Sequence, residues 1–194
     1  MVYNARKGKN AMKKGIILLA DGFEQVEALA TEDILLRTGE IKPMLVSISA
    51  SRRVVSSSGL HVYAEATLDE VDPREFDFLV LPGGKRGVEN LGASEKVLSL
   101  IRDYHEQGKP HYAICAAPSI LGNLGYLDGK SYTCFPGFER GNGNWVDAGA
   151  VKDGDLITGR SMAYTIEFAE NIVEALLGEE ALLRTRPGTR GLRK

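Results

Sequence analysis

Cysteine and histidine are both scarce in this sequence. Its 194 residues include two cysteines, Cys115 and Cys134, and three histidines. Two cysteines do not make a disulfide framework, and no CxxC motif or Cys/His cluster indicates a metal site, so we expect reduced thiols in a cytoplasmic protein. No histidine follows Cys115 in the chain. A cysteine–histidine triad of the usual kind is therefore not expected.

Long apolar runs and a strong net charge are also missing. The early stretch GIILLA at 15–20 is too short for a signal-peptide core and is soon followed by Asp21 and Glu24. Nothing in the sequence approaches a membrane span. The formal net charge of -2 gives no overall attraction to nucleic acid or to membranes. With 43% apolar residues, the chain is long enough for one domain with a full core.

The two ends of the chain are basic and lack acidic residues. Neither end shows hydrophobic periodicity. We therefore expect flexible basic tails at 1–11 and 184–194, around a single domain at 12–183. The alternative is that the tails bind a weak anionic partner.

Between the tails, apolar strand-like runs alternate with helical patterns. Strands are expected at 15–20, 43–49, 76–84, 111–116 and 131–134. Helices are expected at 23–39, 94–107 and 163–177, with a short one from Pro118. A small β excursion at 53–68 turns near Ser58-Gly59, and a hairpin at 150–160 turns at Asp153-Gly154. This alternation predicts a doubly wound, mostly parallel α/β sheet.

Three loops follow strands of the predicted sheet. They read ADGFEQVE at 20–27, LPGGKRG at 81–87 and CAAPS at 115–119. Ligands bind outside the carboxyl ends of strands in such sheets, so we expect a site built from these loops.

Cys115 is placed where enzymes hold nucleophiles, between a strand and a helix start. A sharp turn there lifts the side chain out of the sheet, and the positive helix end is expected to lower the pKa of the thiol. The alternative is a small apolar residue that fills the strand end. Cys134, in YTCFPG, lacks this context and is expected to be structural.

Acids and glycines in the other two loops can complete such a site. Glu24 and Glu27 lie one helical turn apart, and one carboxyl suffices to shuttle a proton near the sulfur. Both can equally be ordinary acids of a first helical turn. The N–H groups of Gly83 and Gly84, with that of Ala116, can form an oxyanion hole. The alternative for the glycines is a tight turn.

Four motifs together resemble the ThiJ/PfpI superfamily, and within it the branch of the Parkinson-disease-associated deglycase and bacterial ThiJ proteins. They are ILLADGFEQVEAL, FDFLVLPGGKRGVENL, AICAAPSIL and TIEFAENIVEALLG. The resemblance implies a flavodoxin-like α/β sandwich, a homodimer and no metal or organic cofactor. It places the reactive cysteine at Cys115, its carboxyl partner at Glu27 and the backbone donors at Gly83, Gly84 and Ala116. Glu24 is then a supporting residue.

The sequence departs from the family pattern around the pocket. Ala116 stands where the protease-like branch has a histidine, and Phe135 stands where some closer members have one. Ser58 replaces an arginine of some members, and the turn before the last helix reads GRSMAYT at 159–165. Because these departures lie at the rim of the expected pocket, they affect which substrate the pocket accepts more than they affect the fold.

The resemblance implies two functions that share one site. The first is a cofactor-free glyoxalase or deglycase, in which Cys115 attacks a small 2-oxoaldehyde such as methylglyoxal and Glu27 moves a proton. The second is a redox-sensing stress protein or chaperone that uses oxidation of the same cysteine. Glutaminase-type amidotransferase activity requires a histidine downstream of Cys115, which the sequence lacks. Neither function involves nucleic acid or membranes.

Overall fold

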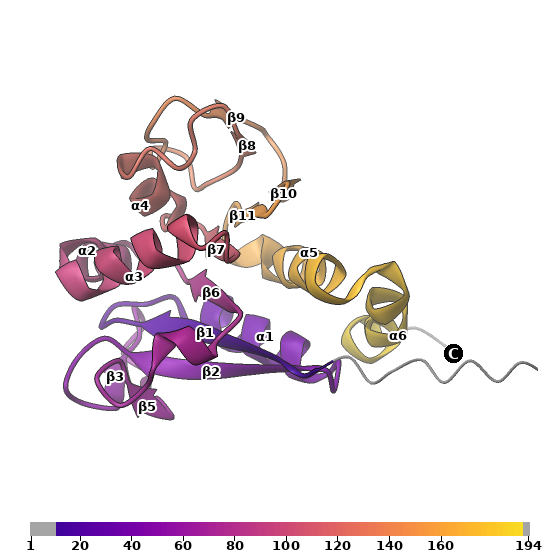
Figure 1. Cartoon of the computed structure of the whole chain (residues 1–194), viewed down its shortest axis with the longest axis horizontal. Coiled ribbons are helices and arrows are strands. Elements are labelled where there is room, and N and C mark those ends of the chain that lie inside the picture. Colours follow the sequence, from indigo (N-terminus) through magenta and orange to yellow (C-terminus); the bar gives the residue numbers. More distant parts are fainter. Residues whose placement is uncertain (1–10, 192–194) are drawn as a thin grey trace, which may run out of the picture.

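A mostly parallel sheet runs through the centre of the molecule (Figure 1). The computed structural model describes residues 11–191. Among these residues, seven strands form the central sheet in the order β10-β11-β7-β6-β1-β2-β5. The inner strands are β1 (Lys13–Leu19), β2 (Ile41–Ser47), β6 (Phe78–Leu81) and β7 (His111–Ile114), all paired in parallel. The predicted doubly wound α/β sheet is confirmed.

The sheet edges are formed by shorter strands. On one side β5 (Ala66–Thr67) pairs in parallel with β2. On the other side β11 (Leu156–Gly159) pairs in parallel with β7 and antiparallel with β10 (Ala150–Asp153). The β10–β11 pair is the expected hairpin, with Gly154 at φ +63° in its turn.

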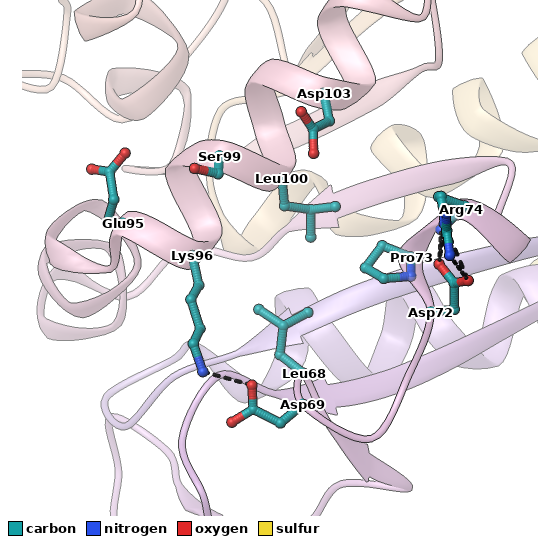
Figure 2. Close-up of a pocket in the computed structure, with 10 residues that line it drawn as sticks. All are labelled: Leu68, Asp69, Asp72, Pro73, Arg74, Glu95, Lys96, Ser99, Leu100 and Asp103. Atoms are coloured by element: carbon teal, nitrogen blue, oxygen red, sulfur yellow. Dashed lines mark hydrogen bonds and ion pairs between the residues drawn. The ribbon is translucent and has the colours of Figure 1, made fainter.

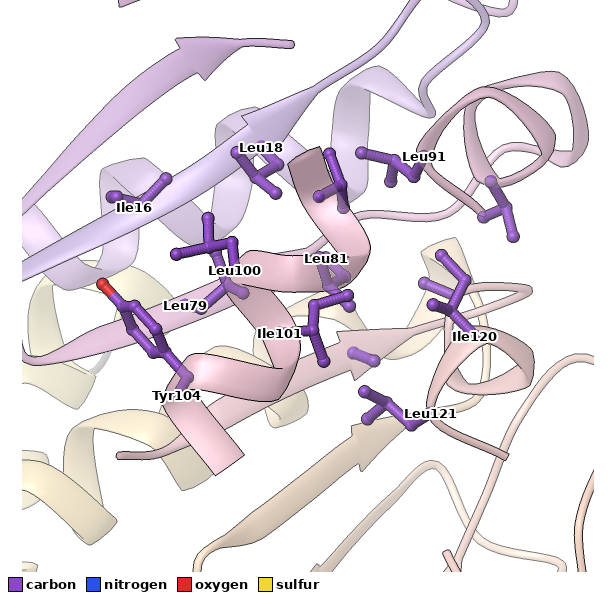
Figure 3. Close-up of a cluster of buried hydrophobic side chains, with 14 of the residues drawn as sticks. Ile16, Leu18, Leu79, Leu81, Leu91, Leu100, Ile101, Tyr104, Ile120 and Leu121 are labelled. Atoms are coloured by element: carbon purple, nitrogen blue, oxygen red, sulfur yellow. The ribbon is translucent and has the colours of Figure 1, made fainter. Parts of the chain in front are cut away.

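Helices cover both faces of the sheet and create two cores. One core joins β1, β6 and β7 to α2 (Lys85–Ala93), α3 (Glu95–Glu106) and α4 (Pro118–Asn123). Figure 3 shows Leu100, Ile101 and Ile120 of these helices packed over Leu18 and Leu81 of the sheet. The other core joins the opposite sheet face to α1 (Gln25–Leu36) and α5 (Thr165–Leu177). Because both faces are covered, all four residues of β6 are buried.

The helices expected from the sequence are present with shifted ends: the first was predicted at 23–39, and α1 covers Gln25–Leu36. Ser94 caps α3, where its side chain accepts the Val97 N–H, and Gly108 follows this helix with φ +63°. Gly178, at φ +86°, ends α5. The last helix was expected from residue 163, but Met162–Tyr164 form a 3-10 turn, η2, before α5 begins. Helix α2 was not predicted.

The β excursion forms a separate hairpin. Its strands β3 (Arg53–Val55) and β4 (His61–Tyr63) are antiparallel, and Gly59 has φ +88° in the connecting turn. A 3-10 turn, η1 (Pro73–Glu75), then leads into β6. The expected strand at 131–134 is shorter than predicted: β8 (Ser131–Tyr132) pairs with β9 (Asn144–Trp145) outside the central sheet.

The carboxyl-terminal expectation was wrong for residues 184–190. These residues belong to helix α6 (Glu179–Arg190), which packs against α5 through buried Ala181 and Leu182. Two of the arginines expected in a solvated tail, Arg186 and Arg190, instead pair with the buried Glu170 carboxylate. Residues 1–10 and 192–194 of the expected tails lie outside the described residues. Within residues 11–191, no helix is long and apolar enough to cross a membrane.

Candidate active site

The three predicted loops meet at one edge of the sheet. Strands β1, β6 and β7 are parallel neighbours, so their carboxyl ends lie side by side. Helix α1 follows β1, the Gly83-Gly84 loop follows β6, and Cys115 follows β7 directly. The topology therefore brings Glu27, Gly83 and Cys115 together.

The backbone at Cys115 is strained. Its φ of +64° is the one positive φ of a non-glycine residue among the described residues. A side chain held in this region costs on the order of 1–3 kcal/mol and persists only where the surroundings fix it. The Cys115 N–H donates to the Gly159 carbonyl at 2.8 Å, and its carbonyl accepts the Phe135 N–H at 2.8 Å. These bonds hold the sharp turn, which leaves the Cys115 side chain partly exposed.

Glu27 lies beneath this cysteine and is fully buried. Its Oε2 accepts the Gly83 N–H at 2.8 Å, and its carboxyl faces the Cys115 side chain. Its Oε1 is buried and makes no hydrogen bond of standard geometry within the described part of the chain. A Cβ on Gly83 would lie 2.5 Å from both the Cys115 Cβ and Glu27 Oε2, so this close meeting requires glycine.

The acid and the thiol shift each other's ionisation. Burial raises the pKa of Glu27 to about 7, despite hydrogen bonds with Cys115 and the Gly83 amide. Burial, together with the neighbouring Glu27, raises the pKa of the Cys115 thiol to about 12. The expected lowering of this pKa was therefore wrong, because burial and the carboxylate outweigh the backbone N–H groups. Protonation of Glu27 removes the opposing charge and supplies an O–H donor, so the two groups titrate as a pair.

Two backbone N–H groups are directed at the sulfur. They belong to Gly84 and Ala116, and their hydrogen bonds favour the thiolate. Gly84 has φ +88°, and a Cβ there would lie 2.3 Å from the Gly22 carbonyl oxygen. The Gly83 N–H does not fit its expected role as an oxyanion donor, because the Glu27 carboxyl already accepts it.

Glu24 holds the acid in place rather than facing the sulfur. It is the N-cap of α1, and its Oε2 accepts the Glu27 N–H at 2.8 Å. Its own N–H donates to the Gly83 carbonyl at 3.0 Å. Glu24 thus ties the start of α1 to the glycine loop and fixes the position of Glu27.

The other residues noted in the sequence do not contribute a side chain to the Cys115–Glu27 pair. Phe135 is 45% exposed and bonded to the Cys115 carbonyl through its N–H, a link that sequence spacing does not reveal. Cys134 is fully buried, as expected of a structural residue. Ser58 donates to Gln25 Oε1 at 2.7 Å and joins the hairpin to α1. His111 begins β7, at the opposite end from Cys115.

A separate hollow lies away from Cys115 and Glu27. It has a volume of about 510 Å³ and lies between residues 68–74 and α3 (Figure 2). Its acids Asp69 and Asp72 are paired with Lys96 and Arg74. None of the predicted site residues lines it. Within residues 11–191, no group of three or more His, Cys, Asp or Glu side chains is arranged to hold a metal ion.

Comparison with known proteins decides the family. The model of the DJ-1/PfpI family matches residues 13–175. The chain belongs to the DJ-1/PfpI family. This match spans the three loops and all the strands of the central sheet.

Members of the DJ-1/PfpI family are similar over most of the chain. Protein dj-1beta of Drosophila melanogaster is 35% identical over 180 residues, which cover 91% of this chain and 96% of that protein. A deglycase of Pyrococcus horikoshii is 34% identical over 84% of this chain and 99% of its own length. The chain spans only 40% of the length of Protein DJ-1 homolog B of Arabidopsis thaliana, to which it is 34% identical.

Solved structures of the family share the fold. A crystallised DJ-1 superfamily protein of Salmonella typhimurium superposes with a TM-score of 0.86 at 35% identity, covering 94% of this chain and 100% of that one. The crystal structure of Drosophila melanogaster DJ-1beta gives the same TM-score over 92% of this chain and 97% of its own. The flavodoxin-like arrangement implied by the motifs is confirmed.

Proposed function

We propose that this DJ-1/PfpI chain is a cofactor-free enzyme that converts small 2-oxoaldehydes, free or as adducts, into 2-hydroxy acids. The observation that carries the proposal is the buried Glu27 carboxyl, with a pKa raised by burial to about 7, facing the partly exposed Cys115. A group with a pKa near the working pH can both accept and donate a proton. Relatives named as deglycases support this choice of reaction.

The first step is addition of Cys115 to the aldehyde. The sulfur forms a bond to the aldehyde carbon while Glu27, as carboxylate, takes the thiol proton. The aldehyde oxygen becomes an oxyanion, which the N–H groups of Gly84 and Ala116 stabilise as they are released from the sulfur. Protonation of that oxygen by Glu27 gives a hemithioacetal and restores the carboxylate.

The second step moves hydrogen between the two carbons. Glu27 removes the proton from the former aldehyde carbon and delivers it to the neighbouring keto carbon. The hydroxyl proton of the first carbon passes to the keto oxygen, and the product is a thioester of a 2-hydroxy acid. Water then hydrolyses the thioester and restores the thiol of Cys115. In total, one 2-oxoaldehyde and one water give one 2-hydroxy acid, and no oxidant or reductant is consumed. An amine adduct, a hemiaminal, enters this sequence when a bond from the Cys115 sulfur replaces its carbon–nitrogen bond and Glu27 passes the thiol proton to the leaving amine.

Turnover of methylglyoxal to lactate by the purified chain tests the proposal. Cys115→Ser should abolish lactate formation, because the nucleophile is lost. Cys134→Ser is the matched control and should retain wild-type turnover, because Cys134 is buried among structural residues. Lactate formation that survives Cys115→Ser would contradict the proposal, and so would a wild-type protein without turnover.

A second candidate function is redox sensing at the same cysteine. Glu27 Oε1 is buried and makes no hydrogen bond of standard geometry within residues 11–191, so it can donate to an oxygen on the sulfur when the acid is protonated. Two equivalents of peroxide would convert the thiol to a sulfinate and release two waters. Both cysteine pKa values are raised to about 12, so access rather than ionisation should separate them.

Peptide mass mapping after mild peroxide treatment tests this second function. Cys115, which is partly exposed, should gain two oxygens well before the fully buried Cys134. Modification of both cysteines at similar rates would argue against a specialised oxidation site.

A further inference from the structure

A groove lies between α2, which follows the Gly83-Gly84 loop, and α4, which follows Cys115. Its volume is about 450 Å³, and its walls are one side of α2, one side of α4 and the loop at 137–140. This is more space than a three-carbon aldehyde needs. The proposed reaction at Cys115 does not account for it.

Two walls of the groove are continuous with the groups that hold the sulfur. Lys85 lines the groove and directly follows Gly84, whose N–H is directed at the Cys115 sulfur. Ser119 lines the opposite wall, and its hydroxyl donates to the Ala116 carbonyl at 2.6 Å. The N–H of Ala116 is the second donor to the sulfur. Each of these walls is therefore one residue or one hydrogen bond away from a backbone group that holds the sulfur.

The third wall is fixed by close backbone packing. A Cβ on Gly122 would lie 2.4 Å from the Arg140 carbonyl oxygen, so the loop at 137–140 rests directly on α4. The Phe138 N–H donates to the Phe135 carbonyl at 3.1 Å, and Phe135 in turn bonds to Cys115. These contacts place Phe138 and Arg140 at the groove.

The groove lining carries two cationic side chains, Lys85 and Arg140, and one acid. Within residues 11–191, the structure shows no salt bridge at Lys85 or Arg140, and Arg140 Nη1 donates only to backbone carbonyls of residues 137 and 139. Helix α2 has no acidic residue in its first turn and no side-chain cap, so its positive end adds to this charge. Glu89 is the single acid of the lining.

Gly92 leaves one position of the α2 wall without a side chain and lowers the stability of this helix. Gly92 lies on the lining face of α2, where glycine costs roughly 1 kcal/mol relative to alanine. A Cβ there would find its nearest neighbour at 3.8 Å, an ordinary contact with Ile120. Packing therefore does not require glycine at this position.

From this arrangement, and on the basis of the function proposed for Cys115, we propose that the groove binds a carboxylate carried by the substrate. The preferred substrates are then adducts of a 2-oxoaldehyde with an amine or thiol that bears a carboxylate, rather than the free aldehyde. The reacting carbon lies at Cys115 and the carboxylate lies between Lys85 and Arg140.

Alkylation of Cys115 tests the groove without requiring turnover. Bromoacetyl-β-alanine and its carboxamide carry the same reactive carbon, from which the sulfur displaces bromide, and differ only in the distant charge. In the wild-type chain the acid should label Cys115 about five- to tenfold faster than the amide, the range that two partly exposed ion pairs supply. Lys85→Met and Arg140→Met should each reduce this preference, and the double variant should abolish it.

Arg86→Met is the matched control. Arg86 is the next residue on α2 but lines a different hollow, with Asp21 and Asn90, so its loss should leave the acid preference unchanged.

An acid that labels no faster than the amide would overturn the proposal, as would an Arg86→Met effect equal to that of Lys85→Met. A thiol that neither reagent labels would overturn both the groove and the enzyme proposals. An intact acid preference without methylglyoxal turnover would overturn only the enzyme proposal.

Discussion

At the residue scale, sequence spacing alone does not show whether Glu24 or Glu27 is the partner of Cys115. Two acids three residues apart on a helix differ by about 60° in direction, so the pattern alone leaves either one as the partner of Cys115. The structure gives them different tasks. Glu24 caps α1, whereas Glu27 is buried, accepts the Gly83 N–H and faces the sulfur.

The surroundings of Cys115 also explain why the direction of its pKa shift was predicted wrongly from the sequence. The sequence showed a helix start after Cys115, which lowers a thiol pKa. It did not show that Glu27 is fully buried against the thiol, and loss of solvent around the pair raises the pKa of both groups. Burial depends on the packing of α1 against the sheet, which a local motif does not contain.

Glu27 should make the stability of the protein depend on pH. Its pKa is raised from 4.5 to about 7, so the native state holds this proton between those values while the unfolded state has released it. The stabilisation is complete below about pH 4.5 and is lost as pH rises through 7. Relative to Glu27→Gln, the wild-type chain should lose about 2–3 kcal/mol of unfolding free energy between pH 5 and 8.

Urea unfolding of both proteins across this pH range measures the effect. Glu24→Gln serves as the control, because it removes the other acid of this loop and leaves the buried Glu27 carboxyl in place. A constant difference between wild type and Glu27→Gln would show that the native acid ionises normally.

At the element scale, the strands that build the site were predictable because they are short, largely apolar runs followed by loop residues. Helix α2 was missed because Gly87 and Gly92 lower its helix propensity. Gly87 is explained only by tertiary contact, since a Cβ there would lie 2.8 Å from the Phe23 backbone. Helix α6 was missed because Glu170, which its arginines neutralise, lies in α5.

The loop after β6 should be the least tolerant of added atoms. Gly83→Ala introduces a Cβ about 2.5 Å from both the Cys115 Cβ and Glu27 Oε2, so it should separate the pair and remove methylglyoxal turnover. Gly92→Ala adds the same methyl group to α2 with room to spare and should raise stability by about 0.5–1 kcal/mol. Thermal unfolding and turnover of the two variants check both expectations. A fully active Gly83→Ala would contradict the geometry described for the site.

At the scale of the whole molecule, several exposed apolar side chains lie on α1 and the β3–β4 hairpin. Val26 and Leu36 on α1 are 38% and 46% exposed, and Leu60 and Tyr63 on the hairpin are 48% and 73% exposed. The Ser58–Gln25 hydrogen bond joins the two elements. Such a surface supports the homodimer that the family resemblance implies, formed around residues 26–37 and the hairpin.

Light scattering at micromolar concentration should therefore give twice the chain mass of 21.1 kDa. Leu60→Asp should shift the protein toward monomer, because it places a charge in the proposed interface. Leu183→Asp, at an equally exposed leucine on α6, should not. A monomeric wild-type chain, or equal effects of both substitutions, would rule out this interface.

The central claim is that Glu27 transfers protons for Cys115 during turnover, and kcat/KM for methylglyoxal in Glu27→Gln and Glu24→Gln tests it most directly. Glutamine preserves the shape of Glu27 but cannot accept the proton, so kcat/KM should fall by about 10²-fold or more, the range of general acid–base catalysis. Glu24→Gln retains a side-chain oxygen for the helix cap and should change kcat/KM only a few-fold. If Glu24→Gln is the inactive variant, or if neither variant loses activity, the account of Glu27 is contradicted.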